Sequence, residues 1–70
     1  MMDRLTVDSS SLASVGYEPE TETLEIEFKG GGVYHYYNVP QITYDGLMQA
    51  PSAGKYFYAF IRHDFPCAKL

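Results

Sequence analysis

The chain has 70 residues, including seven tyrosines and four phenylalanines, and a formal net charge of −4 at pH 7. This length allows one domain near the lower size limit for an independent core, and the aromatic side chains compensate because each buries a large area. No apolar run approaches the roughly 20 residues of a membrane span, and the first residues lack the apolar segment of a secretory signal. A lone cysteine, Cys67, gives no disulfide framework. We therefore expect a single domain over residues 1–70 in the cytoplasm, without membrane contact.

The charge is unevenly distributed along the chain. Seven of the nine acidic residues lie within residues 1–27, whereas four of the five Lys and Arg residues follow them. An acidic protein repels polyanions as a whole, which argues against indiscriminate nucleic-acid binding. A local basic face in the second part of the chain is still compatible with this charge, and the asymmetry points to one.

The first part of the chain predicts strands and turns. Residues 5–8 predict a short extended segment, and the serines at 9–11 predict a turn because small hydroxyl side chains bond nearby backbone groups. Residues 12–17 predict a strand with a bulge at Gly16, and residues 18–23 predict a polar turn.

A β-hairpin around three glycines organises the chain. Residues 24–28 alternate apolar and acidic side chains, which is typical of an antiparallel strand with one wet face. Residues 33–39 are rich in β-branched and aromatic side chains and predict a second strand, which ends at Pro40. Within it, Tyr34 and Tyr36 share one face because side chains alternate along a strand.

Two registers are open for this hairpin. A two-residue loop would pair Phe28 with Val33 and place His35 among apolar side chains. A three-residue loop would pair Phe28 with Tyr34 and set His35 opposite Glu27. We favour the three-residue loop because it buries two tyrosines and pairs an imidazole with a carboxylate. The choice decides whether the tyrosines belong to the core or form an exposed platform.

Two helices are predicted after Pro40. Residues 41–50 carry an apolar stripe, and proline suits the first turn of a helix. Ser52 can cap a second helix that runs from Ala53 to about His63. Residues 67–70 predict a frayed tail. The apolar arc of the second helix that we expect to dock on the sheet consists of Ala53, Phe57, Phe60 and Ile61.

These elements predict a small α+β domain. We expect an antiparallel β-meander of three to four strands with two C-terminal helices packed on one face.

Motifs for catalysis and metal binding are weak. Residues 52–55 resemble a phosphate loop but lack its first glycine and the hydroxyl residue after the lysine. His63 and Cys67 are four residues apart, but Pro66 interrupts the helical spacing, and a structural zinc site needs about four ligands. We therefore expect no enzyme activity, no metal and no cofactor.

A basic and aromatic face of the second predicted helix is the strongest candidate site. Tyr58 lies one turn from both Lys55 and Arg62, and His63 follows. The two cations would hold phosphates while the tyrosine stacks on a base. An ordinary solvated face explains the same pattern equally well. His35 is expected nearby on the surface, as a partner of a glutamate. Tyr34 and Tyr36 would add a stacking platform if they were exposed, but the favoured register places them in the core.

The chain resembles the KTSC domain over nearly its whole length and in the right order. The resemblance implies a module of this size, found at the C-terminus of some lysyl-tRNA synthetases and as small stand-alone bacterial or phage proteins. It implies no established activity, although the synthetase context suggests RNA binding. The residues that carry it are Val7-x-Ser9-Ser10, Gly16-Tyr17, Leu24-x-Ile26-x-Phe28, Tyr34-x-Tyr36, Val39-Pro40, Ser52-x-Gly54-x-Tyr56-Phe57 and Ile61-Arg62.

We thus predict a small non-catalytic binding module that takes RNA or a nucleotide. Two alternatives come from other functional classes. The first is a protein-interaction module that uses an aromatic surface or an open strand edge. The second is a small protein that sequesters a nucleotide signal, which an enclosed pocket lined by tyrosines and a cation would favour. The sequence does not predict an oligomeric state.

Overall fold

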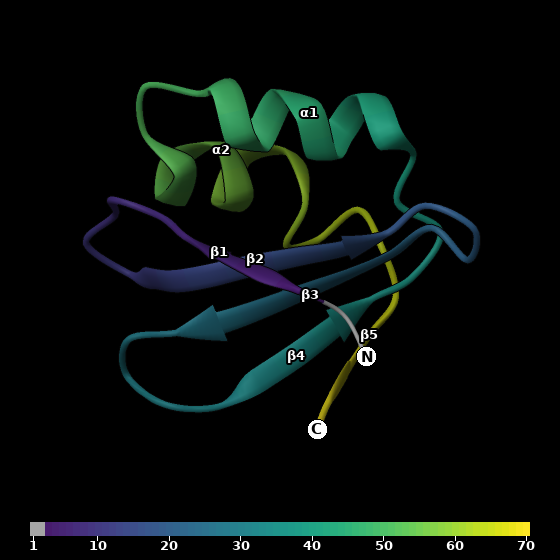
Figure 1. Ribbon diagram of the computed structural model, residues 1–70, viewed down its shortest axis with the longest axis horizontal. Coiled ribbons are helices and arrows are strands. Elements are labelled where there is room, and N and C mark those ends of the chain that lie inside the picture. Colours follow the sequence, from purple (N-terminus) through teal and green to yellow (C-terminus); the bar gives the residue numbers. More distant parts are fainter. Residues whose placement is uncertain (1–2) are drawn as a thin grey trace.

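The computed structural model describes residues 3–70, which form one five-stranded antiparallel sheet and two helices (Figure 1). The strands follow one another across the sheet in chain order, and both helices, inserted between the last two strands, cover the same face. The α+β class and the two helices on one face are confirmed. The elements are β1 (Arg4–Thr6), β2 (Leu12–Glu18), β3 (Thr23–Phe28), β4 (Val33–Tyr36), α1 (Gln41–Gln49), α2 (Ala53–Phe60) and β5 (Cys67–Lys69).

The strand count of three to four was wrong because the predicted tail is a strand. β5 pairs with β4 in antiparallel register, with Cys67 opposite Tyr36, and the Leu70 N–H donates to the Val33 carbonyl at 2.8 Å. A strand of three residues is too short for an alternation of apolar and polar side chains to identify it from the sequence. It forms here because the edge of β4 offers unpaired backbone groups to the returning chain.

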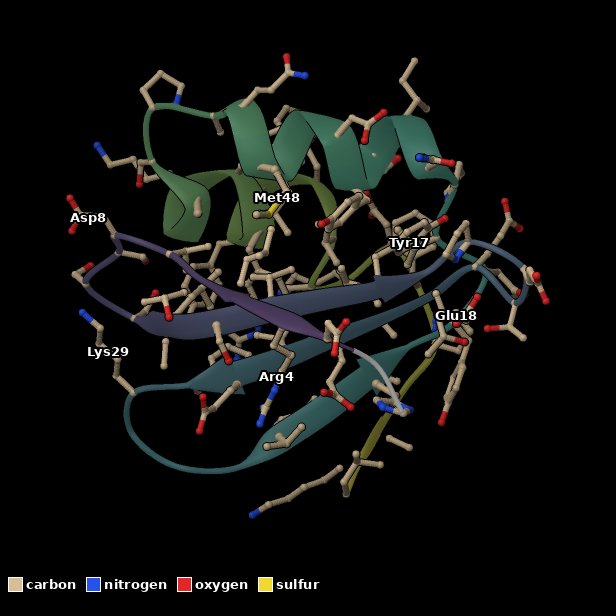
Figure 2. The ribbon with its side chains drawn as sticks, viewed as in Figure 1. Arg4, Asp8, Tyr17, Glu18, Lys29 and Met48 are labelled. Atoms are coloured by element: carbon tan, nitrogen blue, oxygen red, sulfur yellow. The ribbon has the colours of Figure 1, made fainter. Side chains whose placement is uncertain are left out.

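The two faces of the sheet differ sharply. Figure 2 shows Tyr17 and Met48 in the layer between the sheet and the helices, and Arg4 on the opposite side. The Tyr17 hydroxyl donates to the Val39 carbonyl at 2.5 Å, and its ring stacks on Tyr44 with centroids 4.6 Å apart. The buried apolar side chains of this layer are Leu12, Val15, Leu24, Ile26, Tyr36, Val39, Leu47, Ala53, Phe57 and Ile61.

The hairpin between β3 and β4 adopts neither predicted register. His35 lies opposite Glu25 instead of Glu27, and the Phe28 N–H donates to the Gly32 carbonyl at 3.1 Å. Two of the turn glycines have φ angles of 108° and 91°, which other residues rarely adopt, so the chain can reverse over residues 29–31. The register is shifted by two residues from the favoured one. Each side chain therefore stays on its predicted face while its partner changes.

The bulge of β2 lies before Ser14 and not at the predicted Gly16. The register shifts between Leu12 and Ser14, and Gly16 pairs regularly with Arg4 on one side and Glu25 on the other. Without an extra residue, Leu12 and Ser14 would share a face. The bulge instead buries the leucine in the core and lets the serine hydroxyl donate to a glutamate of β3 on the polar face.

The chain leaves helical geometry earlier than predicted. The Ser52 cap is confirmed, since its hydroxyl accepts from the Lys55 N–H at 3.2 Å. However, α2 ends at Phe60, and Ile61 already has a φ of −118°. Phe60 was predicted to dock on the sheet but is 55% exposed. The reason is that Gly54 is buried, so the buried side of α2 is centred closer to Gly54 than predicted. Phe60 then lies at the margin of that side.

The serine turn and α2 pack directly against each other. The Ser9 hydroxyl accepts from the N–H groups of Ser11 and Leu12, both at 3.2 Å, as expected for turn chemistry. A Cβ built on Gly54 would lie 2.8 Å from Ser11 Oγ and 3.1 Å from Ser9 Oγ. This close approach explains why glycine stands at this position of the helix. Within residues 3–70, no helix is long and apolar enough to cross a bilayer.

Candidate functional site

A groove of about 370 Å³ opens where the helices leave part of the sheet uncovered. The helices bury Val15 and Ile26 completely, whereas Tyr34, their neighbour in the same row across the sheet, is only half-buried. The uncovered part of this face lies along β4 and β5. The residues that line the groove are Phe28, Gly31, Tyr34, Tyr36, Phe57, Tyr58, Arg62, His63 and Cys67.

Aromatic rings form the floor of the groove. Tyr36 is 4% exposed and meets Phe57 edge to face, with centroids 5.3 Å apart. Tyr34 meets Phe28 in the same way at 5.4 Å. Edge-to-face contacts of this kind fix ring orientation as well as burying area. Tyr36 is therefore a core residue, and half-buried Tyr34 is the more accessible part of the floor. The pair does not form the exposed platform that was the alternative.

The wall formed by the end of α2 is cationic. The Arg62 guanidinium carbon lies 5.0 Å from the centroid of the Tyr58 ring, which is a cation–π arrangement. Tyr58 is 46% exposed, and within residues 3–70 Arg62 forms no ion pair. His63 follows it on the same wall. A guanidinium without an ion pair thus lies over a planar ring in the wall of the groove.

The electrostatics of the floor keep Tyr36 in its neutral form. The pKa of Tyr36 is raised to about 12, chiefly by burial and to a smaller extent by neighbouring Cys67, while Arg62 acts to lower it. A folded-state pKa above the ordinary value means that the hydroxyl stays protonated throughout the neutral range.

Five of the seven predicted site residues lie together in the groove: Tyr34, Tyr36, Tyr58, Arg62 and His63. Lys55 does not join them, because it lines a separate depression on the outer side of α2. On a continuous helix, Lys55 and Arg62 would share a face about 10 Å apart. The helix ends at Phe60, however, and the turn that follows carries Arg62 away from that face.

His35 lies on the opposite face of the sheet from the groove. Its Nε2 is 2.8 Å from Glu25 Oε1, and Arg4 Nε is 3.3 Å from the other oxygen of the same carboxylate. Arg4 also lies 3.8 Å from Glu27, which accepts from the Ser14 hydroxyl at 2.8 Å. The expectation that His35 partners a surface glutamate holds, but the partner differs and the residue is not near the groove. Arg4 had no sequence signal for this role.

Four groove residues, Phe28, Gly31, Phe57 and Cys67, were not predicted as site residues from the sequence. Phe28 and Phe57 have the pattern of ordinary core positions, Gly31 that of a turn and Cys67 that of a tail. The signal for Cys67 would have been the pairing of β5 with β4, which is a long-range contact. In the part of the chain that the structure describes, no three His, Cys, Asp or Glu side chains gather as a metal site.

Comparisons with known proteins agree on one family. The family model described as the KTSC domain matches residues 8–65. A lysine–tRNA ligase from Nostoc sp. is 39% identical over 66 residues, which cover 94% of this chain but only 12% of that enzyme. An uncharacterised protein from Stutzerimonas stutzeri is 45% identical over 56 residues, covering 80% of this chain and 79% of that protein. The crystal structure of a KTSC domain protein from Yersinia pestis is similar with a TM-score of 0.97 and 38% identity. It covers 100% of this chain and 99% of that one.

Proposed function

This chain belongs to the KTSC domain family, and we propose that it is a non-catalytic module that binds single-stranded RNA in the groove. The observation that carries this proposal is the meeting of Tyr58, Arg62 and the tyrosines of β4 in one concavity. Single-stranded nucleic acid is bound by stacking on aromatic rings next to cations that hold the backbone. The names of three relatives specify tRNA, which supports an RNA ligand.

The charge distribution supports binding to one region of the surface. The glutamates Glu25 and Glu27 lie on the sheet face opposite the groove, where they already pair with Arg4 and His35. A strand would therefore meet the cationic wall of the groove while the acidic face points away. We also propose a cytoplasmic location, because the unpaired Cys67 is compatible with a reducing compartment.

Reversing the charge of Arg62 is expected to weaken RNA binding selectively. Arg62→Glu should raise the Kd for a single-stranded RNA about tenfold, which corresponds to about 1.4 kcal/mol for one lost charged contact. Fluorescence anisotropy of a labelled oligonucleotide would measure this at an ionic strength of about 0.1 M, where the Debye length is about 10 Å.

Lys55→Glu is the matched control, because it makes the same change in net charge from α2 but lies outside the groove. We expect it to change the Kd less than about threefold, as for a screened distant charge. Thermal unfolding would confirm that both variants are folded. Equal losses in the two variants, or no loss in Arg62→Glu, would reject the groove as the binding site.

A protein-interaction function has separate support from the depression around Lys55. Its lining is largely apolar, and Phe60 at its edge is 55% exposed. Exposed apolar patches often contact protein partners. Salt distinguishes the two functions, since phosphate contacts weaken steeply with ionic strength and an apolar interface does not.

A further inference from the structure

We propose that the groove holds one unpaired nucleotide within a strand, with Lys69 and Arg62 contacting the two phosphates that flank it. This inference rests on the proposed RNA-binding function and specifies the unit that the site takes. Lys69 is a residue that neither the sequence pattern nor the groove lining identifies. It is the register of β5 that brings it to the site.

Lys69 lies beside Gly32 of the hairpin turn, next to Gly31 of the groove lining. It pairs directly with Tyr34, so both side chains project from the helix-covered face of the sheet. A Cβ built on Gly32 would lie 3.4 Å from Lys69 Cε and 3.4 Å from Tyr34 Cε1. The lysine side chain and the tyrosine ring therefore both approach the same turn glycine.

Arg62 lies toward the other end of the same floor. Cys67 and Tyr36 form the neighbouring cross-strand pair on this face, and both line the groove with Arg62. Arg62 is also close enough to Tyr36 to lower the pKa of its hydroxyl. The Tyr34–Lys69 and Tyr36–Cys67 pairs are two residues apart along β4, which is about 6.7 Å at 3.3–3.4 Å per residue. A cation thus marks each end of an aromatic floor.

These dimensions suit a single nucleotide. The groove volume of about 370 Å³ is near the lower end of the range of about 300–1,000 Å³ for small-ligand sites. Two phosphates that flank one nucleotide are joined through a single sugar. In an unstacked strand they can separate further along the strand than in a stacked helix, where the axial rise is roughly 3.4 Å per nucleotide. The base can then lie against the tyrosine floor while its phosphates reach Arg62 and Lys69. With so few cations, the site cannot follow a long strand.

The test uses calorimetric titration of the full chain with adenosine 3′,5′-bisphosphate, adenosine 5′-monophosphate and a single-stranded oligoadenylate. We expect the bisphosphate to bind about tenfold more tightly than the monophosphate, as for one additional charged contact. Lys69→Gln should remove this difference, whereas Lys55→Gln should retain it. For the oligoadenylate, log K should fall with log salt concentration with a slope of about −1.4, the value for two phosphates on a single strand.

The outcomes separate this inference from the proposed function. Equal affinities for the bisphosphate and the monophosphate, or an unchanged difference in Lys69→Gln, would overturn the two-phosphate site. If the oligoadenylate still bound, RNA binding would survive that result. A salt slope steeper than about −3 would show that more than four phosphates are held, which contradicts a one-nucleotide site. No binding of any of the three ligands would overturn RNA binding and the inference together.

Discussion

Phe57→Ala is expected to unfold a large part of the protein population at room temperature. Phe57 is 1% exposed, and its ring meets those of Phe28, Tyr36 and Tyr58 at centroid distances of 5.5, 5.3 and 5.3 Å. Removing such a side chain costs about 3–5 kcal/mol. Native proteins have about 0.05–0.15 kcal/mol of stability per residue, so a chain of this length has little reserve. Urea denaturation followed by circular dichroism would give the free energy of unfolding.

Phe60→Ala is the matched control for this prediction. It makes the same chemical change three residues later, but Phe60 is 55% exposed, and its ring centroid lies 4.9 Å from that of Tyr56 in the same helix. We expect a cost below about 1 kcal/mol, as for most exposed positions. Similar losses in the free energy of unfolding for the two variants would contradict the way in which α2 is docked, because of these two phenylalanines only Phe57 faces the sheet.

Gly46→Ala is expected to destabilise the protein by about 1–3 kcal/mol, although alanine is the better helix former by about 1 kcal/mol. A Cβ at this position of α1 would collide with the Tyr56 hydroxyl and lie 2.8 Å from its Cζ and 3.1 Å from its Cε2. Tyr56 belongs to α2, and its ring also packs on Phe60. Its freedom to move aside is therefore limited.

The sign of this effect should reverse when the obstacle is removed. In a Tyr56→Ala background, Gly46→Ala should stabilise the protein by about 0.8–1 kcal/mol through helix propensity alone. A double-mutant cycle based on urea denaturation would measure the coupling. Stabilisation by Gly46→Ala in both backgrounds would show that the two helices do not make this close contact.

The faces of the sheet could be predicted from the sequence, but the register could not. The alternation of residues 24–28 identifies the buried face of β3, and the tyrosines of β4 follow from the same period. A shift of two residues leaves every face unchanged, so alternation cannot distinguish the observed register from its neighbour. The decision lies in the backbone of the turn, where two glycines adopt positive φ angles.

The candidate site was predicted in part, and its two errors have different origins. Tyr58, Arg62 and His63 were identified correctly as one group because they are close in sequence. Lys55 was grouped with them on the assumption of a helix that continues past Phe60, but α2 ends there. Lys69 was missed because only the pairing of β5 with β4 places it beside Tyr34. The Lys55 error thus comes from a helix end that the local pattern does not mark, and the Lys69 error from a contact between distant parts of the chain.

The most direct test of the groove as the RNA site is the alkylation rate of Cys67. It is the only cysteine of the chain, it is exposed, and it lines the groove with Arg62. Iodoacetamide is uncharged, so its approach reports access rather than charge, and mass spectrometry counts the modified fraction. We predict that saturating single-stranded RNA slows alkylation of the wild type, and that Arg62→Glu needs about a tenfold higher RNA concentration for the same protection, in line with its expected Kd. An unchanged alkylation rate when RNA is fully bound would show that the strand lies elsewhere on the molecule.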